Sequence, residues 1–104
     1  MSVVIVAILT PVAGATQKVI AGFEQQSPLA HQEEGCELYS VGIDQDGLVV
    51  VVERWASQES IQKHATGPVF TRLMELIGDS LAKPLELHQL TSIPIGDPLK
   101  GTIQ

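Results

Sequence analysis

A chain of 104 residues, of which 44% are hydrophobic and only 17% charged, is long enough for one domain with one modest core. Its net charge of −6 and its lack of any Lys/Arg cluster disfavour nucleic acid as a partner, because phosphate binding needs concentrated positive charge. The apolar run Val3–Leu9 is too short for a membrane span and follows no basic segment, so we predict a cytoplasmic protein without a membrane partner. The single cysteine, Cys36, excludes an intrachain disulfide.

The first strand is predicted over Val3–Leu9, where a continuous apolar run rich in β-branched residues indicates burial on both faces. A helix follows, with Thr16 as its predicted N-cap and apolar residues at helical spacing. We predict that Ser27-Pro28 interrupts this helix and starts a second, short one. Gly35 then ends the helical region in the left-handed conformation that suits glycine.

Two further strands form a predicted hairpin. They span Cys36–Ile43 and Leu48–Trp55, and residues 44–47 between them (Asp-Gln-Asp-Gly) contain the Asp-Gly signal of a hairpin turn. The second of these strands contains four consecutive valines, so it is also apolar on both faces.

The second half of the chain is predicted to contain two helices and a last strand. Ser57 caps a short helix, and the sequence Thr66-Gly67-Pro68 ends it and begins another. The fourth strand spans Leu85–Thr91, and a tail rich in Pro and Gly follows. The inward face of the longer helix carries apolar residues at spacings of three and four, namely Val69, Phe70, Leu73, Met74, Ile77 and Leu81.

The resulting order β-α-β-β-α-β predicts the ferredoxin-like fold, an α+β architecture in which helices cover one face of a four-stranded antiparallel sheet. We assign residues 1–92 to this domain and residues 93–104 to a C-terminal tail. Strands that are apolar on both faces require a cover for the second face, and the chain has no further elements to supply it. We therefore predict a homodimer joined through its sheet faces. The tail is expected to lie on a surface, either its own or that of the partner subunit.

Two side chains around the third strand are candidates for a site. Strict alternation places Trp55 on the same strand face as Val51 and Glu53. His64 lies on the inward stripe of the following helix, so its imidazole and the indole of Trp55 are expected to face the same space. The alternative is that Trp55 only fills the core and that His64 is a hydrogen-bonded residue at its edge.

Glu53 ends an otherwise apolar strand. A carboxyl group partly buried beside an indole has a raised pKa and can donate or accept a proton. The alternative is an ion pair of Glu53 with Arg72 or Lys63. No two histidines have metal-ligand spacing, and glycine-rich phosphate loops and the Gly-x-Ser-x-Gly motif are absent, so we predict neither a metal nor a common cofactor.

Three stretches together resemble the antibiotic biosynthesis monooxygenase (ABM) domain, and in particular its small quinol-monooxygenase-like members. They are EEGCELY (33–39), VVERWASQESIQKH (51–64) and GPVF (67–70), in the order and at the separations typical of that family. The likeness covers residues 3–92, nearly the whole chain. It implies a dimeric α/β barrel and, for some members, oxygenation of a quinol or a polyketide-like aromatic without metal, flavin or haem.

The resemblance also implies roles for individual residues. Trp55 matches the family tryptophan that lines the pocket, and His64 matches a recurrent helix histidine. Val51 and Met74 replace polar residues with which some polyketide oxygenases hold their substrate, which implies a more apolar pocket. The haem-degrading branch has an asparagine on its first strand and a histidine on its last long helix. This chain contains no asparagine, and Ala7 and Met74 occupy those positions, so haem degradation is disfavoured.

The leading hypothesis is a homodimeric, cofactor-independent monooxygenase that uses O2 on a small aromatic quinol or polyketide-like substrate. Trp55 would pack against the substrate ring, Phe70 and Met74 would form an apolar wall, and His64 or Glu53 would assist proton removal. The alternative is a non-catalytic dimeric protein of the same fold that binds a small molecule or acts in a stress response, because a fold does not fix a reaction.

Overall fold

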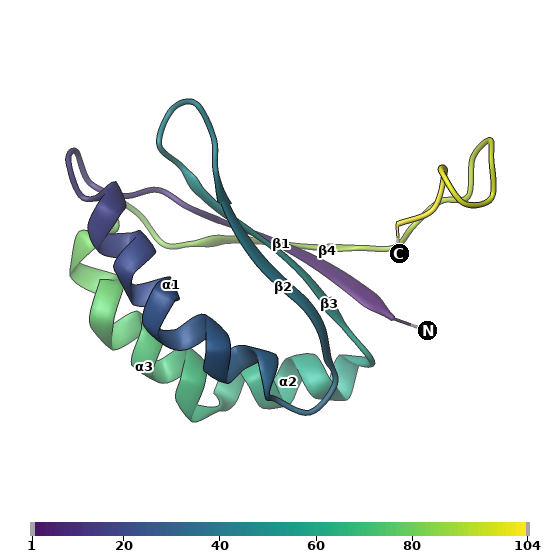
Figure 1. Cartoon of the computed structure of the whole chain (residues 1–104), viewed down its shortest axis with the longest axis horizontal. Coiled ribbons are helices and arrows are strands. Elements are labelled where there is room, and N and C mark those ends of the chain that lie inside the picture. The colour runs from purple at the N-terminus through teal and green to yellow at the C-terminus, as the bar shows by residue number, and fades with distance from the viewer. Residues whose placement is uncertain (1, 104) are drawn as a thin grey trace.

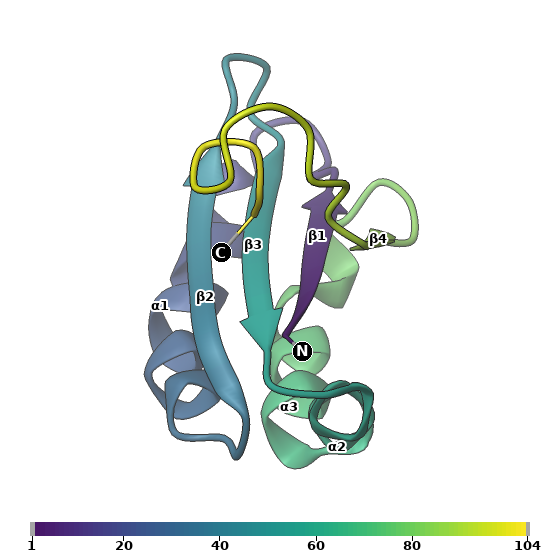
Figure 2. The ribbon, with the colours of Figure 1, turned by 90° about the vertical axis from the view of Figure 1, so that its right-hand side faces the viewer.

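The computed structural model describes residues 2–103 as a four-stranded antiparallel sheet with helices on one of its faces (Figure 1). The elements in chain order are β1 (Val3–Leu9), α1 (Thr16–His31), β2 (Cys36–Ile43), β3 (Val49–Trp55), α2 (Gln58–Thr66), α3 (Pro68–Ile77), the 3-10 turn η1 (Gly78–Ser80) and β4 (Glu86–Leu90). The strands lie in the order β2-β3-β1-β4, side by side in Figure 2 with α1 and α3 behind them. The predicted ferredoxin-like α+β fold is confirmed.

The first helix differs from the prediction. Helix α1 is continuous through Ser27-Pro28, although proline removes one backbone donor and disfavours helical geometry in the residue before it. Two contacts explain why the last turn still forms: Ala30 is fully buried in the core, and Gln26 Nε2 donates to the carbonyl of Val69 at 3.1 Å. Tertiary packing therefore outweighs the local preference for a break.

Two capping predictions also change. Ala15 occupies the N-cap position of α1, and the Thr16 hydroxyl donates instead to the carbonyl of Gly47 in the β2–β3 turn, at 3.2 Å. Gly35 has the predicted positive φ of 84°, but it lies in the connection to β2, because the helix already ends at His31. Helix α3 ends at Ile77, so Leu81 lies beyond it and forms a β-bridge with Pro11.

The core lies between the helices and the inner face of the sheet, and β3 shows the two faces most clearly. Val49, Val51, Glu53 and Trp55 alternate inward and are buried, while Val50, Val52 and Arg54 point to the outer face. The predicted alternation is confirmed. Among the residues that the structure describes, no helix covers the outer face, where apolar side chains such as Val52 stay exposed.

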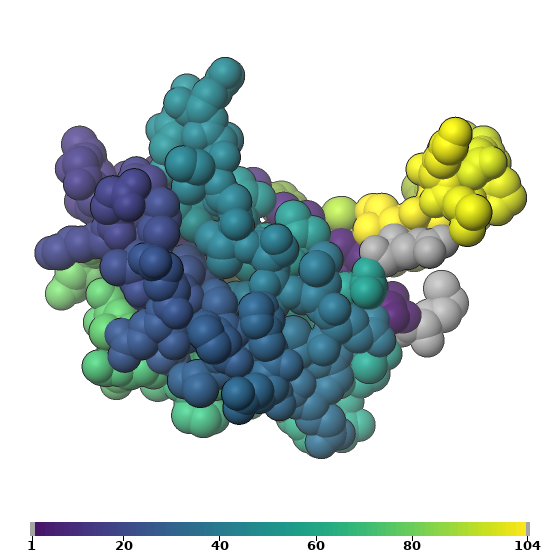
Figure 3. Space-filling model, in the orientation of Figure 1, coloured from purple at the N-terminus to yellow at the C-terminus, as the bar shows by residue number. Residues whose placement is uncertain are grey.

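The C-terminal tail leaves the end of β4 on the side of the sheet opposite to the helices (Figure 1). Its apolar side chains, Ile93, Ile95, Leu99 and Ile103, are exposed. In the space-filling view, the β2–β3 hairpin and the tail rise at two ends of the outer face and leave a hollow between them (Figure 3). None of the helices within residues 2–103 has the length and apolar character to span a membrane.

Candidate functional site

A cavity of about 80 Å³ lies between the inner face of the sheet and helices α2 and α3. Eleven of its lining residues are apolar: Ile5, Ala7, Leu9, Phe23, Val51, Ile61, Ala65, Phe70, Leu73, Leu85 and Leu87. The remaining three, Tyr39, Glu53 and His64, carry polar groups. An apolar pocket with a few converging polar groups is the usual form of a small-molecule site.

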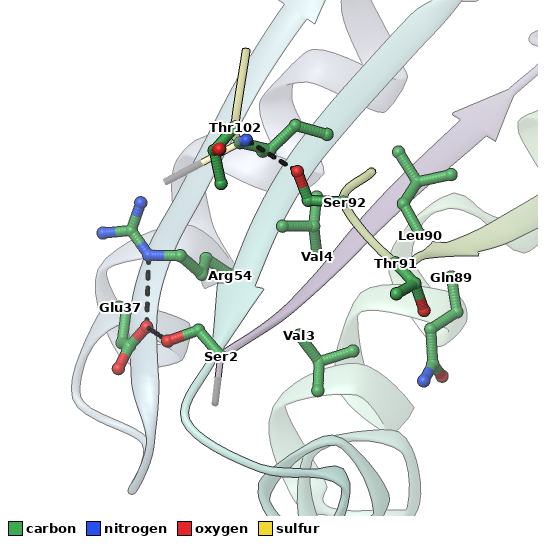
Figure 4. A pocket seen from close by; sticks show the side chains of 11 residues that line it. Ser2, Val3, Val4, Glu37, Arg54, Gln89, Leu90, Thr91, Ser92 and Thr102 are labelled. Carbon is green, nitrogen blue, oxygen red and sulfur yellow. Dashed lines mark hydrogen bonds and ion pairs between the residues drawn. The ribbon is translucent and has the colours of Figure 1, made fainter. Parts of the chain in front are cut away.

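A second hollow, larger and more open at about 900 Å³, lies on the outer face where the tail meets the sheet (Figure 4). Its two charged side chains pair with each other, because the Glu37 carboxylate accepts from Arg54 Nε at 3.1 Å, and this carboxylate also accepts from the Ser2 hydroxyl at 2.6 Å. Because these groups are already paired and remain in contact with water, this hollow offers less chemistry than the smaller cavity on the inner face.

Glu53 occupies the wall of the inner cavity with only 6% of its surface exposed. Trp55, two residues along the same strand face, donates from Nε1 to Glu53 Oε1 at 2.9 Å. Burial raises the pKa of the Glu53 carboxyl above its ordinary value, and the nearby charge of Glu33 adds to the rise. The indole hydrogen bond and His64 oppose the shift without cancelling it. The neutral carboxylic acid is therefore favoured more than in water.

His64 is held from two directions. The Ser57 hydroxyl caps α2 by accepting from the Ser60 N–H at 3.1 Å, which fixes the start of the helix that carries His64. The imidazole lies on the indole of Trp55, with ring centres 4.6 Å apart and planes at 32°. Its Nδ1 is 2.6 Å from Glu33 Oε1, a carboxylate from the α1–β2 connection. The His64 residue is 8% exposed, so this contact is shielded from water.

Tyr39 contributes a phenol to the same cavity from β2. Its ring meets His64 edge to face, with centres 5.8 Å apart. Burial raises the pKa of the Tyr39 hydroxyl well above its usual range, and the carboxylates of Glu53 and Glu33 raise it further. Tyr39 is therefore a neutral hydrogen-bond donor at physiological pH. The His31 ring, which the sequence did not connect with any site, donates from Nε2 to the Tyr39 carbonyl at 2.9 Å.

The structure brings most of the predicted site residues together. Val51, Glu53, His64 and Phe70 line the cavity, and the ring of Phe70 meets that of His64 at 5.9 Å. Trp55 is 0% exposed and lies behind Glu53 and His64 instead of in the lining. Met74 is partly buried on α3, and it does not line the cavity either.

The alternative interpretation, an ion pair of Glu53 with Arg72 or Lys63, is wrong. Lys63 lies 3.7 Å from Glu34 and 3.6 Å from Glu59, while Arg72 pairs with Glu75 at 3.3 Å. Glu53 instead accepts from an indole inside the core.

Two residues of the site, Glu33 and Tyr39, were not predicted. Both lie in the stretch EEGCELY, which the resemblance singled out, so a signal was present in the motif. Neither the strand pattern nor helical spacing could connect Glu33 with His64, because 31 residues separate them. Within residues 2–103, no group of three or more His, Cys, Asp and Glu side chains is arranged to hold a metal ion.

Comparison with known proteins assigns the chain to a family. The sequence profile of the family named antibiotic biosynthesis monooxygenase (ABM) matches residues 2–76. The chain belongs to the ABM family. A comparison with curated proteins gives no match.

Solved structures show the same fold as this ABM chain. Rv0793 from Mycobacterium tuberculosis is 22% identical, with a TM-score of 0.81 over 89% of this chain and 96% of its own. A structure named antibiotic biosynthesis monooxygenase is also 22% identical, with a TM-score of 0.81 over 88% of this chain and 99% of its own. A conserved protein from Methanosarcina mazei Go1 is 20% identical, with a TM-score of 0.80 over 86% of this chain and 91% of its own. At these identities the likeness establishes the fold.

Proposed function

We propose that this ABM protein is a cofactor-independent monooxygenase that acts on a small aromatic quinol or polyketide-like substrate. The observation that carries the proposal is the convergence of Glu53, His64 and Tyr39 on one apolar cavity. An electron-rich phenolate can itself reduce O2, so the protein needs to supply deprotonation, orientation and a dry site.

The surroundings of His64 and Glu53 favour a proton acceptor at the first position and a hydrogen-bond donor at the second. His64 uses Nδ1 for Glu33, which leaves Nε2 as the nitrogen that can take a phenolic proton. Glu53 is pushed towards its neutral form, so its carboxylic acid can donate a hydrogen bond to a substrate oxygen. Trp55 positions both groups, because it stacks on the imidazole and donates to the carboxyl.

The apolar part of the site would hold the substrate ring. Val51 and Phe70 are cavity walls in the structure, and Met74 lies one turn further along α3 from Phe70. A volume of about 80 Å³ is smaller than the roughly 150 Å³ of an engineered apolar cavity that binds benzene. A ring-sized substrate would therefore require the cavity to widen, and we propose that it widens on the β4 side, where the strand pairs with β1 alone and Leu87 is 60% exposed.

The reaction balances without a further reductant. A hydroquinone and O2 give a hydroxyquinone and water: one oxygen atom forms a new C–O bond and the other leaves as water. The substrate supplies all four electrons that O2 accepts. The phenolic proton that His64 takes first is returned to solvent at the end of the cycle.

Oxygen uptake with a panel of hydroquinones and anthrones tests the proposal. We expect turnover by the wild-type protein and a fall in kcat of about 100-fold in His64→Gln, the usual size of a general-base effect. Gln62→Ala, an exposed change on the same helix, is the matched control and should keep full activity.

Absence of oxygen uptake above buffer, with retained ligand binding, would favour the alternative of a non-catalytic binding protein. The small number of polar groups in the cavity is the observation that supports this alternative.

We also infer a homodimer joined through the outer sheet faces. The support is the row of exposed apolar side chains on this face, which includes Leu38, Val52 and Leu90, and the exposed apolar side chains of the tail. The hollow between the hairpin and the tail would receive the partner subunit, with residues 93–104 packing on its surface (Figure 3).

Sedimentation at micromolar concentration tests the dimer. A dimeric wild-type protein and a monomeric Val52→Glu variant are expected, because the change places a charge in the middle of the apolar face. Gln62→Glu on the helix side is the matched control and should remain dimeric. A wild-type protein that sediments as a monomer would contradict the inference.

A further inference from the structure

We propose that Glu33 is a positioning residue that fixes the tautomer of His64 and connects its imidazole to solvent for proton release. The inference rests on the proposed function for its catalytic part. Its structural part concerns only the contact between Glu33 Oε1 and His64 Nδ1, at 2.6 Å.

Glu33 is built into a rigid position. Its backbone N–H donates to the Ala30 carbonyl at 3.0 Å, and its carbonyl accepts from the Cys36 N–H at 3.1 Å, so the turn between α1 and β2 fixes it at both ends. A carboxylate held in this way accepts a hydrogen bond from Nδ1–H and leaves Nε2 unprotonated. The same logic orients the histidine of a Ser-His-Asp triad.

Proton release from the cavity needs a route, and the geometry offers one. Glu53 is 6% exposed and accepts from the Trp55 indole, while Tyr39 is buried and neutral, so neither passes a proton readily to water. The Glu33 side chain is 19% exposed and also contacts the imidazole. It is therefore the group that joins the buried ring to the surface.

The charges around the ring agree with this assignment. The groups that face His64 are Glu33 from the α1–β2 connection, Glu53 from β3 and Tyr39 from β2. On its own helix, Lys63 is exposed and pairs with other glutamates. The site thus places two carboxyl groups around the imidazole, and Glu33 is the one in contact with its Nδ1.

The proton balance is simple. The substrate O–H bond breaks and an N–H bond forms at His64 Nε2. The proton on Nδ1 then passes to Glu33 Oε1, and Glu33 releases it to water. The imidazole returns to its starting tautomer when the oxygen atom that leaves as water takes the Nε2 proton and Glu33 carries a proton from solvent back to Nδ1. No electrons are transferred in these steps.

The test separates the two parts of the proposal by using Glu33→Gln and Glu33→Ala. Glutamine still accepts from Nδ1–H but cannot take a proton, whereas alanine does neither. Nitrogen-15 NMR of the histidines in the unliganded protein should show the Nδ1–H tautomer of His64 in the wild type and in Glu33→Gln, and a mixture in Glu33→Ala. An Nε2–H tautomer in the wild type, or no change in Glu33→Ala, would overturn the positioning role.

Oxygen uptake then tests proton release. We expect kcat to fall roughly 100-fold in Glu33→Gln with KM nearly unchanged, and formate to restore part of the rate in Glu33→Ala. Glu34→Gln is the matched control, because Glu34 is adjacent but 83% exposed, and it should behave as the wild type. Full kcat in Glu33→Gln would overturn the release role. A wild type without oxygen uptake would refute the proposed function, while the NMR comparison would still decide whether Glu33 fixes His64.

Discussion

Glu53 and Glu37 belong to neighbouring strands of one sheet, and their surroundings move their pKa values in opposite directions. Glu53 faces the core, where burial raises the pKa of its carboxyl. Glu37 lies in contact with water, where the hydroxyl of Ser2 and then the guanidinium of Arg54 hold the pKa of its carboxyl below the usual range. The same side chain is thus prepared for proton chemistry at one position and for an ion pair at the other.

The comparison shows that, at these positions, exclusion of water changes the pKa of a carboxyl more than its hydrogen-bond partners do. Glu53 also has a good donor, the indole of Trp55 at 2.9 Å, and an imidazole in the same cavity. Those contacts lower its pKa less than burial raises it. A reactive carboxyl in this fold therefore depends on the core that surrounds it, so changes to that core should affect chemistry and stability together.

The largest effect is expected from Trp55→Phe. The indole is fully buried and donates to Glu53, so its loss leaves a buried acceptor unpaired and a small void. Together these should lower the free energy of unfolding by about 2–4 kcal/mol, measured by urea denaturation. If Trp55 were only core filler without a role in holding Glu53, the loss would be about 1–2 kcal/mol.

A double-mutant cycle sharpens this prediction. In a Glu53→Leu background no carboxyl is left to satisfy, so Trp55→Phe should cost clearly less than it does in the wild type. Equal costs in the two backgrounds would show that the hydrogen bond between the indole and the carboxyl contributes nothing.

The next effect is the pH dependence that Glu53 gives to stability. Its pKa is higher in the folded than in the unfolded protein, so the folded state binds more protons and stability falls as pH rises through the folded-state pKa. Glu53→Gln keeps an acceptor for the indole but cannot ionise. The variant should therefore gain stability relative to the wild type as pH rises above about 4.3, the ordinary pKa of a glutamate, as followed by urea denaturation at each pH. If the wild type instead became more stable relative to Glu53→Gln as pH rises, the pKa of Glu53 would be lowered in the folded protein, which would contradict the prediction.

Most of the fold could be predicted because its strands carry strong local signals. The runs of β-branched residues in β1 and β3 indicated strands that are apolar on both faces, and alternation then placed Glu53 and Trp55 on one face. The continuity of α1 through Pro28 could not be predicted, since it depends on the burial of Ala30 and on the contact of Gln26 with α3. These are tertiary effects that override a local rule.

The candidate site was less predictable for a related reason. His64 and Glu53 could be placed towards the same space from periodicity, but Glu33 reaches His64 from a connection with no regular pattern. Trp55 was expected in the pocket wall, and only the packing shows that it stands behind two lining residues. Periodicity predicts on which face of a strand or helix a side chain lies. Whether that side chain borders the cavity depends on how the neighbouring side chains pack around it.

The smallest effect is expected on the outer face, from Glu37→Gln. The Glu37 carboxylate is exposed, and an exposed ion pair with Arg54 contributes little to stability because water screens it. Its pKa is lowered in the folded protein, so its contribution is present above the unfolded-state pKa and is lost as pH falls through the folded-state pKa. Glu37→Gln should therefore be slightly less stable than the wild type at neutral pH, with the difference vanishing in acid. This slope is opposite in sign to that of Glu53→Gln, so urea denaturation of both variants over the same pH range checks the two glutamates against each other. If the stability of both variants relative to the wild type changed with pH in the same direction, burial would not explain the difference between the two glutamates.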